Sequence, residues 1–238
     1  MQWRGSSLSK ASRFWGLAQP LEGYRFNWDS LVLASLADSI PARHFCDVGT
    51  GCGVIAYLLA SERDRTGLAV DVQREMATFA RENLQDLPVK VICADVRNGL
   101  PADCLFDLVV TNPPYGVMGA QRISPNPSRA IACTALNGDL LDFATAIHGH
   151  CAQDAHFCFV SPDSNWARTR DALEEMGWYA KRVWRFYRGD KPFRVAVDCV
   201  RCLEPYVERS FESQSVVLDA LIEPMIERLG RSKRAMAD

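Results

Sequence analysis

Hydrophobic positions along this chain form short β-branched runs that alternate with segments of helical spacing. Strands are predicted at 44–48, 66–70, 89–93 and 106–111, and helices at 54–60 and 75–84. Strands that alternate with helices form a mostly parallel sheet with helices on both faces. The pattern therefore predicts a Rossmann-like, doubly wound α/β fold.

The flanking segments complete this sheet. A helix is predicted to begin at Asn27 or Asp29, both good N-cap residues, and to end before Pro41. The stretch 116–136 is irregular. Further helices are predicted at 139–151, 166–176 and 215–229, and further strands at 156–160, 179–188 and 193–203. The turn 189–192 predicts a C-terminal hairpin, which places one antiparallel strand in the sheet.

Composition is that of a globular protein, with 48% hydrophobic and 24% charged residues. No run approaches eighteen apolar residues, so no membrane span is predicted. Residues 20–238 are expected to form one domain. Residues 1–19 are basic and lack periodicity, and they are expected to be an N-terminal arm. An organelle transit peptide has a similar composition, and this alternative stays open.

The formal charge of −2 does not favour a protein that coats nucleic acid, so any polyanion site must be a local patch. Nine cysteines, an odd number, are scattered through apolar segments. They do not form the pattern of a disulfide framework, and a reducing cytoplasm is the expected location.

Polar residues stand where four predicted strands end: Asp47, Asp71, Asp95 and Asn112. The carboxyl ends of parallel strands meet at one edge of the sheet, and ligands of such folds bind there. We therefore expect these four side chains to converge on one site.

The turn after the first of these strands contains Gly49, Gly51 and Gly53, in the pattern Asp-x-Gly-x-Gly-x-Gly. A dinucleotide-binding turn has its third glycine one position later, where this chain has Val54. The acid at position 47 would repel a pyrophosphate but tolerates a cationic ligand. S-adenosylmethionine is such a ligand, with Asp71 and Asp95 facing its ribose and adenine. A nicotinamide dinucleotide and a purely structural turn are the alternatives.

The strand at 106–111 stops at Asn112, Pro113, Pro114 and Tyr115. Two prolines fix the backbone and remove two donors, so the turn offers acceptors: the Asn112 side-chain oxygen and the carbonyl groups. Tyr115 adds an aromatic face. Such a turn can hold an exocyclic amino group by both hydrogens while the ring stacks. An ordinary turn that closes a strand is the alternative.

These motifs resemble those of class I methyltransferases that modify amino groups. The segments 23–29 and 124–132 are similar to a narrower group, the bacterial tRNA(Val) adenine-N6 methyltransferases, and the resemblance covers residues 19–203. It implies in-line transfer of a methyl group to an adenine amino nitrogen in RNA, with catalysis by Asn112, Pro113, Pro114 and Tyr115. The family's Arg-His/Tyr-Glu triplet is replaced here by Cys133-Thr134-Ala135.

Three other functions stay open. The same Asn-Pro-Pro-Tyr turn occurs in enzymes that methylate a glutamine amide of release factors and in DNA adenine methyltransferases. A cofactor-binding RNA module without catalysis is the alternative from another class.

Basic residues gather in the predicted hairpin and are interleaved with aromatic residues. The expected RNA-binding cations are Arg182, Arg185, Arg188, Lys191 and Arg194. Cations suit phosphates and aromatic rings suit unstacked bases. A hairpin with one solvated and one buried face gives the same alternation, so both interpretations stay open.

No metal is expected. His148 and His150 are two residues apart on a helical segment, so they face different sides. Cys199 and Cys202 form a lone pair of the C-x-x-C type in a strand pattern, where buried apolar cysteines are the better interpretation.

Overall fold

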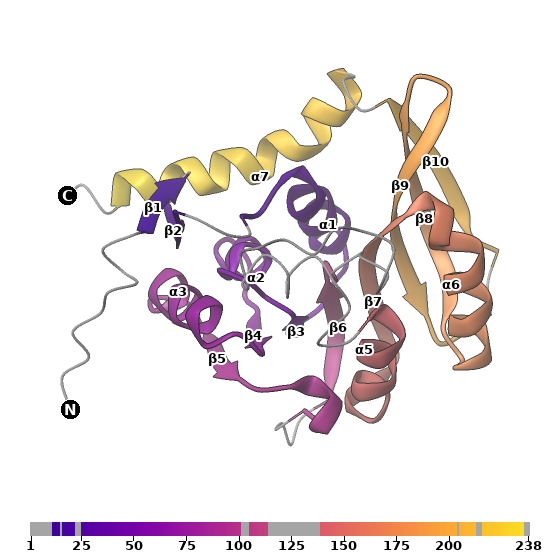
Figure 1. Cartoon of the computed structure of the whole chain (residues 1–238), viewed down its shortest axis with the longest axis horizontal. Helices are drawn as coiled ribbons and strands as arrows, with labels where there is room; N and C mark the ends of the chain where they lie inside the picture. Colours follow the sequence, from indigo (N-terminus) through magenta and orange to yellow (C-terminus); the bar gives the residue numbers. More distant parts are fainter. Residues whose placement is uncertain are drawn as a thin grey trace.

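An eight-stranded sheet runs through the whole molecule (Figure 1). The computed structural model describes residues 11–14, 16–21, 25–100, 105–113, 139–203, 205–212 and 216–235. The strand order is β10-β8-β9-β7-β6-β3-β4-β5. The strands are β3 (His44–Val48), β4 (Thr66–Asp71), β5 (Val89–Cys93), β6 (Phe106–Thr111), β7 (Cys151–Pro162), β8 (Tyr179–Arg188), β9 (Lys191–Val200) and β10 (Val207–Glu212).

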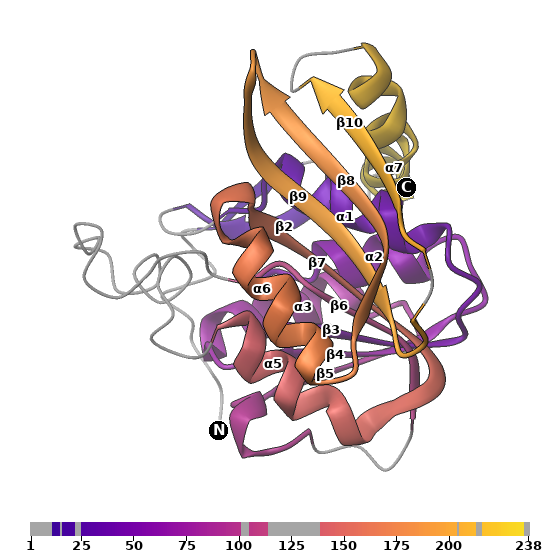
Figure 2. The same ribbon diagram turned by 90° about the vertical axis from the view of Figure 1, so that its right-hand side faces the viewer.

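Strand direction confirms the predicted fold class. β9 is antiparallel to both of its neighbours, β7 and β8, and all other pairs in this sheet are parallel. The central strands are apolar along their length because both of their faces are covered, so that Leu108, Val109 and Val110 are fully buried. Figure 2 shows β8, β9 and β10 turned relative to the central strands, as sheet twist requires.

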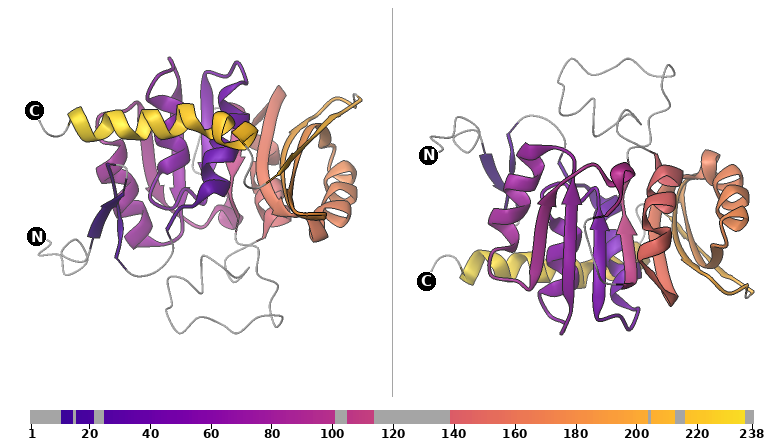
Figure 3. Two further views of the ribbon diagram at one scale, coloured as in Figure 1. Left: turned by 90° about the horizontal axis from the view of Figure 1, so that it is seen from above. Right: turned by 90° about the horizontal axis from the view of Figure 1, so that it is seen from below.

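Helices cover both faces of the sheet (Figure 3). One core contains buried residues of α1 (Trp28–Asp38), α2 (Val54–Ala60), α3 (Arg74–Leu84) and α7 (Val216–Ala235). The other core contains residues of α5 (Leu140–Ile147) and α6 (Asp163–Glu175). Two 3₁₀ turns, η2 (Val96–Asn98) and η4 (His148–His150), complete the described elements. The helix predicted after Asn27 is confirmed as α1, with the Asn27 side chain accepting a hydrogen bond from Asp29 N.

The N-terminal arm was predicted without regular structure, and this was wrong for its second half. Strands β1 (Ala11–Phe14) and β2 (Leu17–Pro20) form an antiparallel pair. The Asn83 side chain accepts from Ala18 N at 2.7 Å and donates to the carbonyl groups of Ala18 and Cys52. A buried amide on α3 thus ties β2 to the glycine turn. Residues 1–10 lie outside the described residues, and the single domain over 20–238 stays a prediction.

Two other boundaries differ from the sequence patterns. β7 begins at Cys151, earlier than the predicted 156, and β10 was not predicted at all. Five of the six β10 residues are exposed, so its sequence lacks an apolar alternation; Phe211 alone is buried there. The Phe211 ring stacks on Phe186 of β8 at 5.4 Å between centroids, which holds this edge strand in place.

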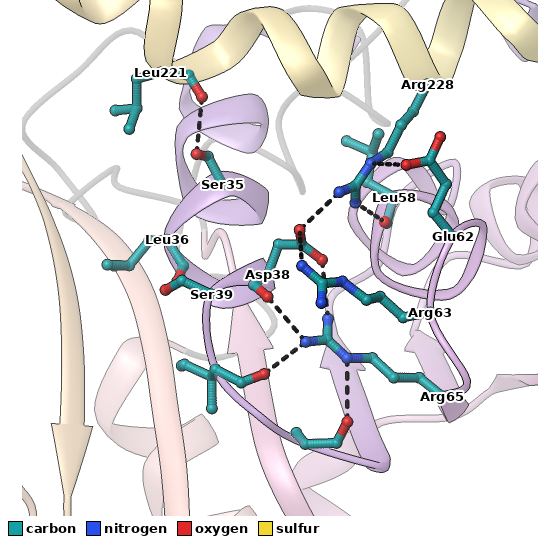
Figure 4. A network of polar contacts seen from close by, with 12 residues as sticks. Ser35, Leu36, Asp38, Ser39, Leu58, Glu62, Arg63, Arg65, Leu221 and Arg228 are labelled. Atoms are coloured by element: carbon teal, nitrogen blue, oxygen red, sulfur yellow. Dashed lines mark hydrogen bonds and ion pairs between the residues drawn. The ribbon is translucent and has the colours of Figure 1, made fainter.

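Asp38 at the end of α1 anchors the C-terminal helix (Figure 4). Its carboxylate accepts from Arg228 of α7 at 2.7 Å and from Arg65 at 3.3 Å. Arg228 also pairs with Glu62 at 3.0 Å. Because Arg65 and Arg228 are nearly buried, their charges require this carboxylate. The network fixes α7 across α1 and α2.

The described helices include none that is both long and apolar enough to cross a membrane.

Candidate active site

Parallel pairing brings the predicted polar residues to one edge of the sheet. Val48 of β3 lies opposite Val70 of β4 on one side and Thr111 of β6 on the other. Asp71 lies opposite Cys93 of β5. The residues that follow these positions are the glycine turn, Asn112 and Asp95, so all of them extend from the same end of the strands.

The glycine turn is held by two carboxylates. Gly49, Gly51 and Gly53 have φ values of 70°, 59° and 86°, which side chains with a Cβ rarely adopt. Asp71 Oδ2 accepts from Gly51 N at 2.8 Å. Asp47 Oδ2 accepts from Thr50 Oγ1 at 2.6 Å and belongs to a side chain with 0% exposure. Asp47 therefore supports the turn from inside the core, and its role in cofactor binding stays a prediction.

A ligand can approach the backbone of the glycine turn from one side. A Cβ added to Gly51 would meet nothing within 4 Å, so the turn is open on that side. A Cβ added to Gly53 would approach Leu84 Cδ1 to 3.0 Å, so this glycine is required for close packing against α3. The middle of the turn is therefore the part that a ligand can approach.

Burial raises the pKa of Asp47 to about 7 and that of Asp71 to about 6. Both carboxylates lose hydration when the chain folds, and their mutual repulsion raises the pKa of Asp47 further. A cation near the turn would stabilise both ionised forms, whereas a phosphate would oppose them. The electrostatics of the site thus fit a cationic ligand such as S-adenosylmethionine.

Asp95 has a partner that the sequence reasoning missed. Its carboxylate accepts from Arg97 Nη2 at 2.6 Å and from Arg97 Nε at 2.9 Å. The hydrogen bond from Arg97 lowers the pKa of Asp95. Asp95 also caps the 3₁₀ turn η2, and a cation two residues after a capping acid is the signal that points to this pair.

Asn112 contacts the first turn of α1, which sequence reasoning had not linked to the site. Its Nδ2 donates to Ser30 Oγ at 3.1 Å. Pro113 is buried beside it, whereas Pro114 and Tyr115 lie outside the described residues.

A cavity of ≈ 30 Å³ joins this asparagine to the glycine turn. Its lining comes from the start of α1, the glycine turn, the start of α2, α3 and the end of β6. Because ligand pockets span roughly 300 Å³ or more, this space can hold only a small chemical group. It lies where the predicted binding site for the methyl donor meets the predicted amino-group-binding turn that begins at Asn112.

The predicted RNA-binding cations do not form one exposed patch. Three have acidic partners within the chain: Arg182 with Asp198 at 2.7 Å, Arg185 with Asp163 and Glu208 at 2.9 Å each, and Arg194 with Asp29 at 3.5 Å. Arg188 and Lys191 are exposed at the end of the β8–β9 hairpin.

The aromatic residues of the hairpin also differ in whether an RNA base could reach them. Trp184 and Phe186 are buried in the core and cannot stack on a base. Phe193 is only half-buried, with the guanidinium carbon of Arg188 4.8 Å from its ring centroid and Trp28 packed against it.

Within the part of the chain that the structure describes, no three His, Cys, Asp or Glu side chains are placed to hold a metal ion. His156 instead hydrogen-bonds Asp198 at 2.6 Å, and Cys199 is a buried free thiol.

Comparisons with known proteins find similarity to methyltransferases. Residues 26–134 match the family model described as "Methyltransferase small domain". A tRNA1(Val) (adenine(37)-N6)-methyltransferase of Citrobacter koseri is 29% identical over 160 residues, and one of Escherichia fergusonii is 27% identical. Each alignment covers 64% of this chain and 64% of the relative's own length.

Two solved structures resemble a larger part of this chain. One, described as a predicted O-methyltransferase of Agrobacterium tumefaciens, has a TM-score of 0.59 at 19% identity and covers 86% of this chain and 96% of its own. The other is the hMettl16 catalytic domain in complex with an RNA hairpin, with a TM-score of 0.57 at 18% identity and coverage of 82% and 78%. At such identities they show the fold alone. The family match and this fold together support S-adenosylmethionine as the cofactor.

The raised pKa of Asp47 predicts a pH dependence of stability. Between about pH 4 and pH 7 the folded chain holds a proton on Asp47 that the unfolded chain, with a pKa of 3.8, releases. The folded state therefore binds more protons, and the free energy of unfolding falls as pH rises through this window. Asp47→Asn should lessen this fall, by about 1.4 kcal/mol for each unit of pKa difference removed.

Urea unfolding at pH 4, 5, 6, 7 and 8 measures this difference. Asp190→Asn, in the exposed β8–β9 turn, is the control and should follow the wild type at every pH. Parallel pH curves for the wild type and Asp47→Asn would show that Asp47 ionises normally in the folded chain.

Proposed function

We propose that this chain methylates the N6 amino group of an adenine in tRNA. It resembles the bacterial tRNA1(Val) adenine-N6 methyltransferases, and its residues 26–134 match the methyltransferase small domain. One observation carries the proposal: Asn112 at the end of β6 lines the same cavity as Gly49 and Gly51 of the glycine turn. The proposed acceptor for a planar amino group would thus lie beside the proposed binding site of a cationic methyl donor.

The proposed chemistry needs acceptors rather than a strong base. When bound, S-adenosylmethionine supplies an electrophilic methyl group on a sulfonium. Asn112 Oδ1 and the Pro113 carbonyl would accept hydrogen bonds from the two N–H groups of the target amine. These bonds would favour a pyramidal nitrogen and direct its lone pair toward the methyl group. As the N–C bond forms, the bond between the methyl carbon and sulfur would break, with S-adenosylhomocysteine as the leaving group, and the methylated nitrogen would then release its extra proton to water. Alignment and preorganised acceptors then supply the rate.

Support for tRNA as the substrate comes from the names of the curated relatives and from the hairpin. The alignments span 64% of those relatives, and the Cys133-Thr134-Ala135 replacement lies outside the described residues. Phe193, with the cation of Arg188 over its ring, offers a surface for an unstacked base. This surface contacts Trp28 on the same turn of α1 that contacts Asn112 through Ser30. A base held at Asn112 must leave its stack, and flanking nucleotides would then lie against the hairpin.

Incubation with methyl-labelled S-adenosylmethionine tests this function directly. The wild type should transfer label to total tRNA, and digestion should yield N6-methyladenosine. Asn112→Ala should lower turnover by at least a hundredfold and leave cofactor affinity within about twofold, because it removes one acceptor of the transition state. Label in duplex DNA or in a release factor, but not in tRNA, would assign one of the alternative substrates. Full activity of Asn112→Ala would discard the mechanism.

The hairpin assignment predicts a change in RNA binding. Arg188→Ala combined with Lys191→Ala should weaken tRNA affinity about tenfold at 0.1 M salt. It should also reduce the slope of log affinity against log salt by about 1.5, because two phosphate contacts are lost. Arg170→Ala on α6 is the control, since Arg170 is a half-buried arginine away from the hairpin and is paired with Asp171 and Glu174. Fluorescence anisotropy with labelled tRNA measures both quantities. An unchanged slope would show that Arg188 and Lys191 do not contact RNA phosphates.

A further inference from the structure

A second cavity lies at the opposite edge of the sheet from the candidate active site. Its volume is ≈ 470 Å³, which is within the range of pockets that bind small molecules. The lining comes from the amino-terminal parts of β3, β6, β7 and β8 and from the end of β9, which runs in the opposite direction. Among the described residues, this cavity and the one beside the glycine turn share no lining residue.

Cations outnumber acids on the wall of this cavity. The cations are Arg43, Lys181 and Arg201, from three separate parts of the chain, and the acids are Asp107 and Asp154. Asp107 Oδ2 already accepts a hydrogen bond from the backbone N–H group of Arg43 at 2.9 Å. The balance of charge on the wall therefore favours an anionic ligand.

The charge of Arg201 has no acidic partner within the described chain. Arg201 is half-buried; its Nη2 donates to the His148 carbonyl, and its guanidinium carbon lies 5.0 Å from the centroid of the Trp178 ring. These contacts hold the guanidinium in place but supply no negative charge. Among the arginines whose side chains the structure describes, all others that are buried or half-buried pair with a carboxylate: Arg65, Arg170, Arg182, Arg185, Arg194 and Arg228.

A cation that is partly removed from water without a counter-charge costs free energy. An anion in the cavity beside Arg201 would offset this cost. The wall is also held in place before a ligand binds, because His156 hydrogen-bonds the buried Asp198 at 2.6 Å and Asp198 pairs with Arg182 at 2.7 Å. A preorganised wall lowers the cost of ordering side chains when the ligand binds.

We propose that this cavity binds a phosphate group, free or carried by a small molecule, with Arg201 and Arg43 as cationic contacts. A phosphate monoester carries nearly two negative charges at pH 7 and has three strong acceptor oxygens, which suits cations that approach from several sides. A carboxylate has one charge and two oxygens. Because this cavity and Asn112 lie at opposite edges of the sheet, the proposed ligand is neither the methyl donor nor the target base. The proposal does not depend on the proposed function.

Titration of the full chain with glycerol 3-phosphate at constant ionic strength tests the proposal. The Nε of Arg201 is buried, so its N–H signal should be protected from exchange with water and visible in ¹H–¹⁵N spectra. Its loss in Arg201→Gln identifies it. Glycerol 3-phosphate should shift this signal with a Kd of about 1 mM or below, and acetate should bind at least tenfold more weakly. The absence of a saturable shift, or equal affinity for acetate, would overturn the proposal.

Arg43→Gln should weaken this binding at least tenfold, because it removes one of the two proposed cationic contacts. Arg43 is exposed, so this substitution should not disturb the core. Arg81→Gln is the matched control, since Arg81 is an exposed arginine on α3, which contacts β4 and β5 at the other end of the sheet. Arg81→Gln should bind as the wild type does. Wild-type affinity in Arg43→Gln would contradict the assignment of Arg43.

Thermal unfolding provides a second readout that does not need the Arg201 signal. Glycerol 3-phosphate should raise the Tm of the wild type and of Arg81→Gln, and it should leave that of Arg201→Gln and Arg43→Gln unchanged, since a ligand stabilises only the fold that binds it. Inorganic phosphate as a parallel ligand distinguishes the sources: equal affinity identifies the free ion, and weaker affinity identifies a phosphate ester. Displacement of glycerol 3-phosphate by tRNA would assign the site to an RNA backbone and overturn the proposal.

Discussion

Parallel pairing of β3 with both β4 and β6 is the constraint on which the site depends. The register that places Val48 between Val70 and Thr111 also brings the glycine turn next to Asp71 on one side and to Asn112 on the other. No long-range loop is required to assemble these groups. A shift of one strand by one residue would turn its buried residues to the opposite face and separate the turn from its partners.

This arrangement costs free energy because it removes two carboxylates from water. Asp47 and Asp71 offset part of their desolvation by accepting hydrogen bonds from the turn, from Gln73 N and from Ala56 N. The remaining cost appears as their raised pKa values. Perturbed acids at the end of a sheet are typical of functional sites, where a ligand completes the charge balance. A sulfonium donor would do so here, and the same preference disfavours a pyrophosphate.

Much of the fold was predictable because its signals are local. Apolar runs and the glycine turn identify β3 to β6 with their two helices, and Asn27 identifies the start of α1. The failures involve contacts between distant residues. β2 is ordered by the Asn83 amide on α3, and β10 is ordered by Phe211 against Phe186, and neither contact leaves a periodic pattern.

The candidate site was likewise predictable only in part. Its strand-end residues follow from the sequence, since topology alone carries them to one edge. Two partners of the predicted residues do not, because Ser30 meets Asn112 and Asp198 meets Arg182 only after folding. Arg97 is different, since it lies two residues from Asp95 and could have been found from the sequence. The basic hairpin illustrates this point: its charge pattern suggests one RNA surface, yet Arg182 and Arg194 form ion pairs with Asp198 and Asp29.

The central claim is that a methyl donor and an amino-group clamp meet at one edge of the sheet. A crystal structure with bound S-adenosylmethionine tests it most directly. The ribose should lie beside Asp71 and the glycine turn, with the sulfonium methyl directed toward Asn112. A donor bound elsewhere, or one whose methyl group points away from Asn112, would contradict the claim.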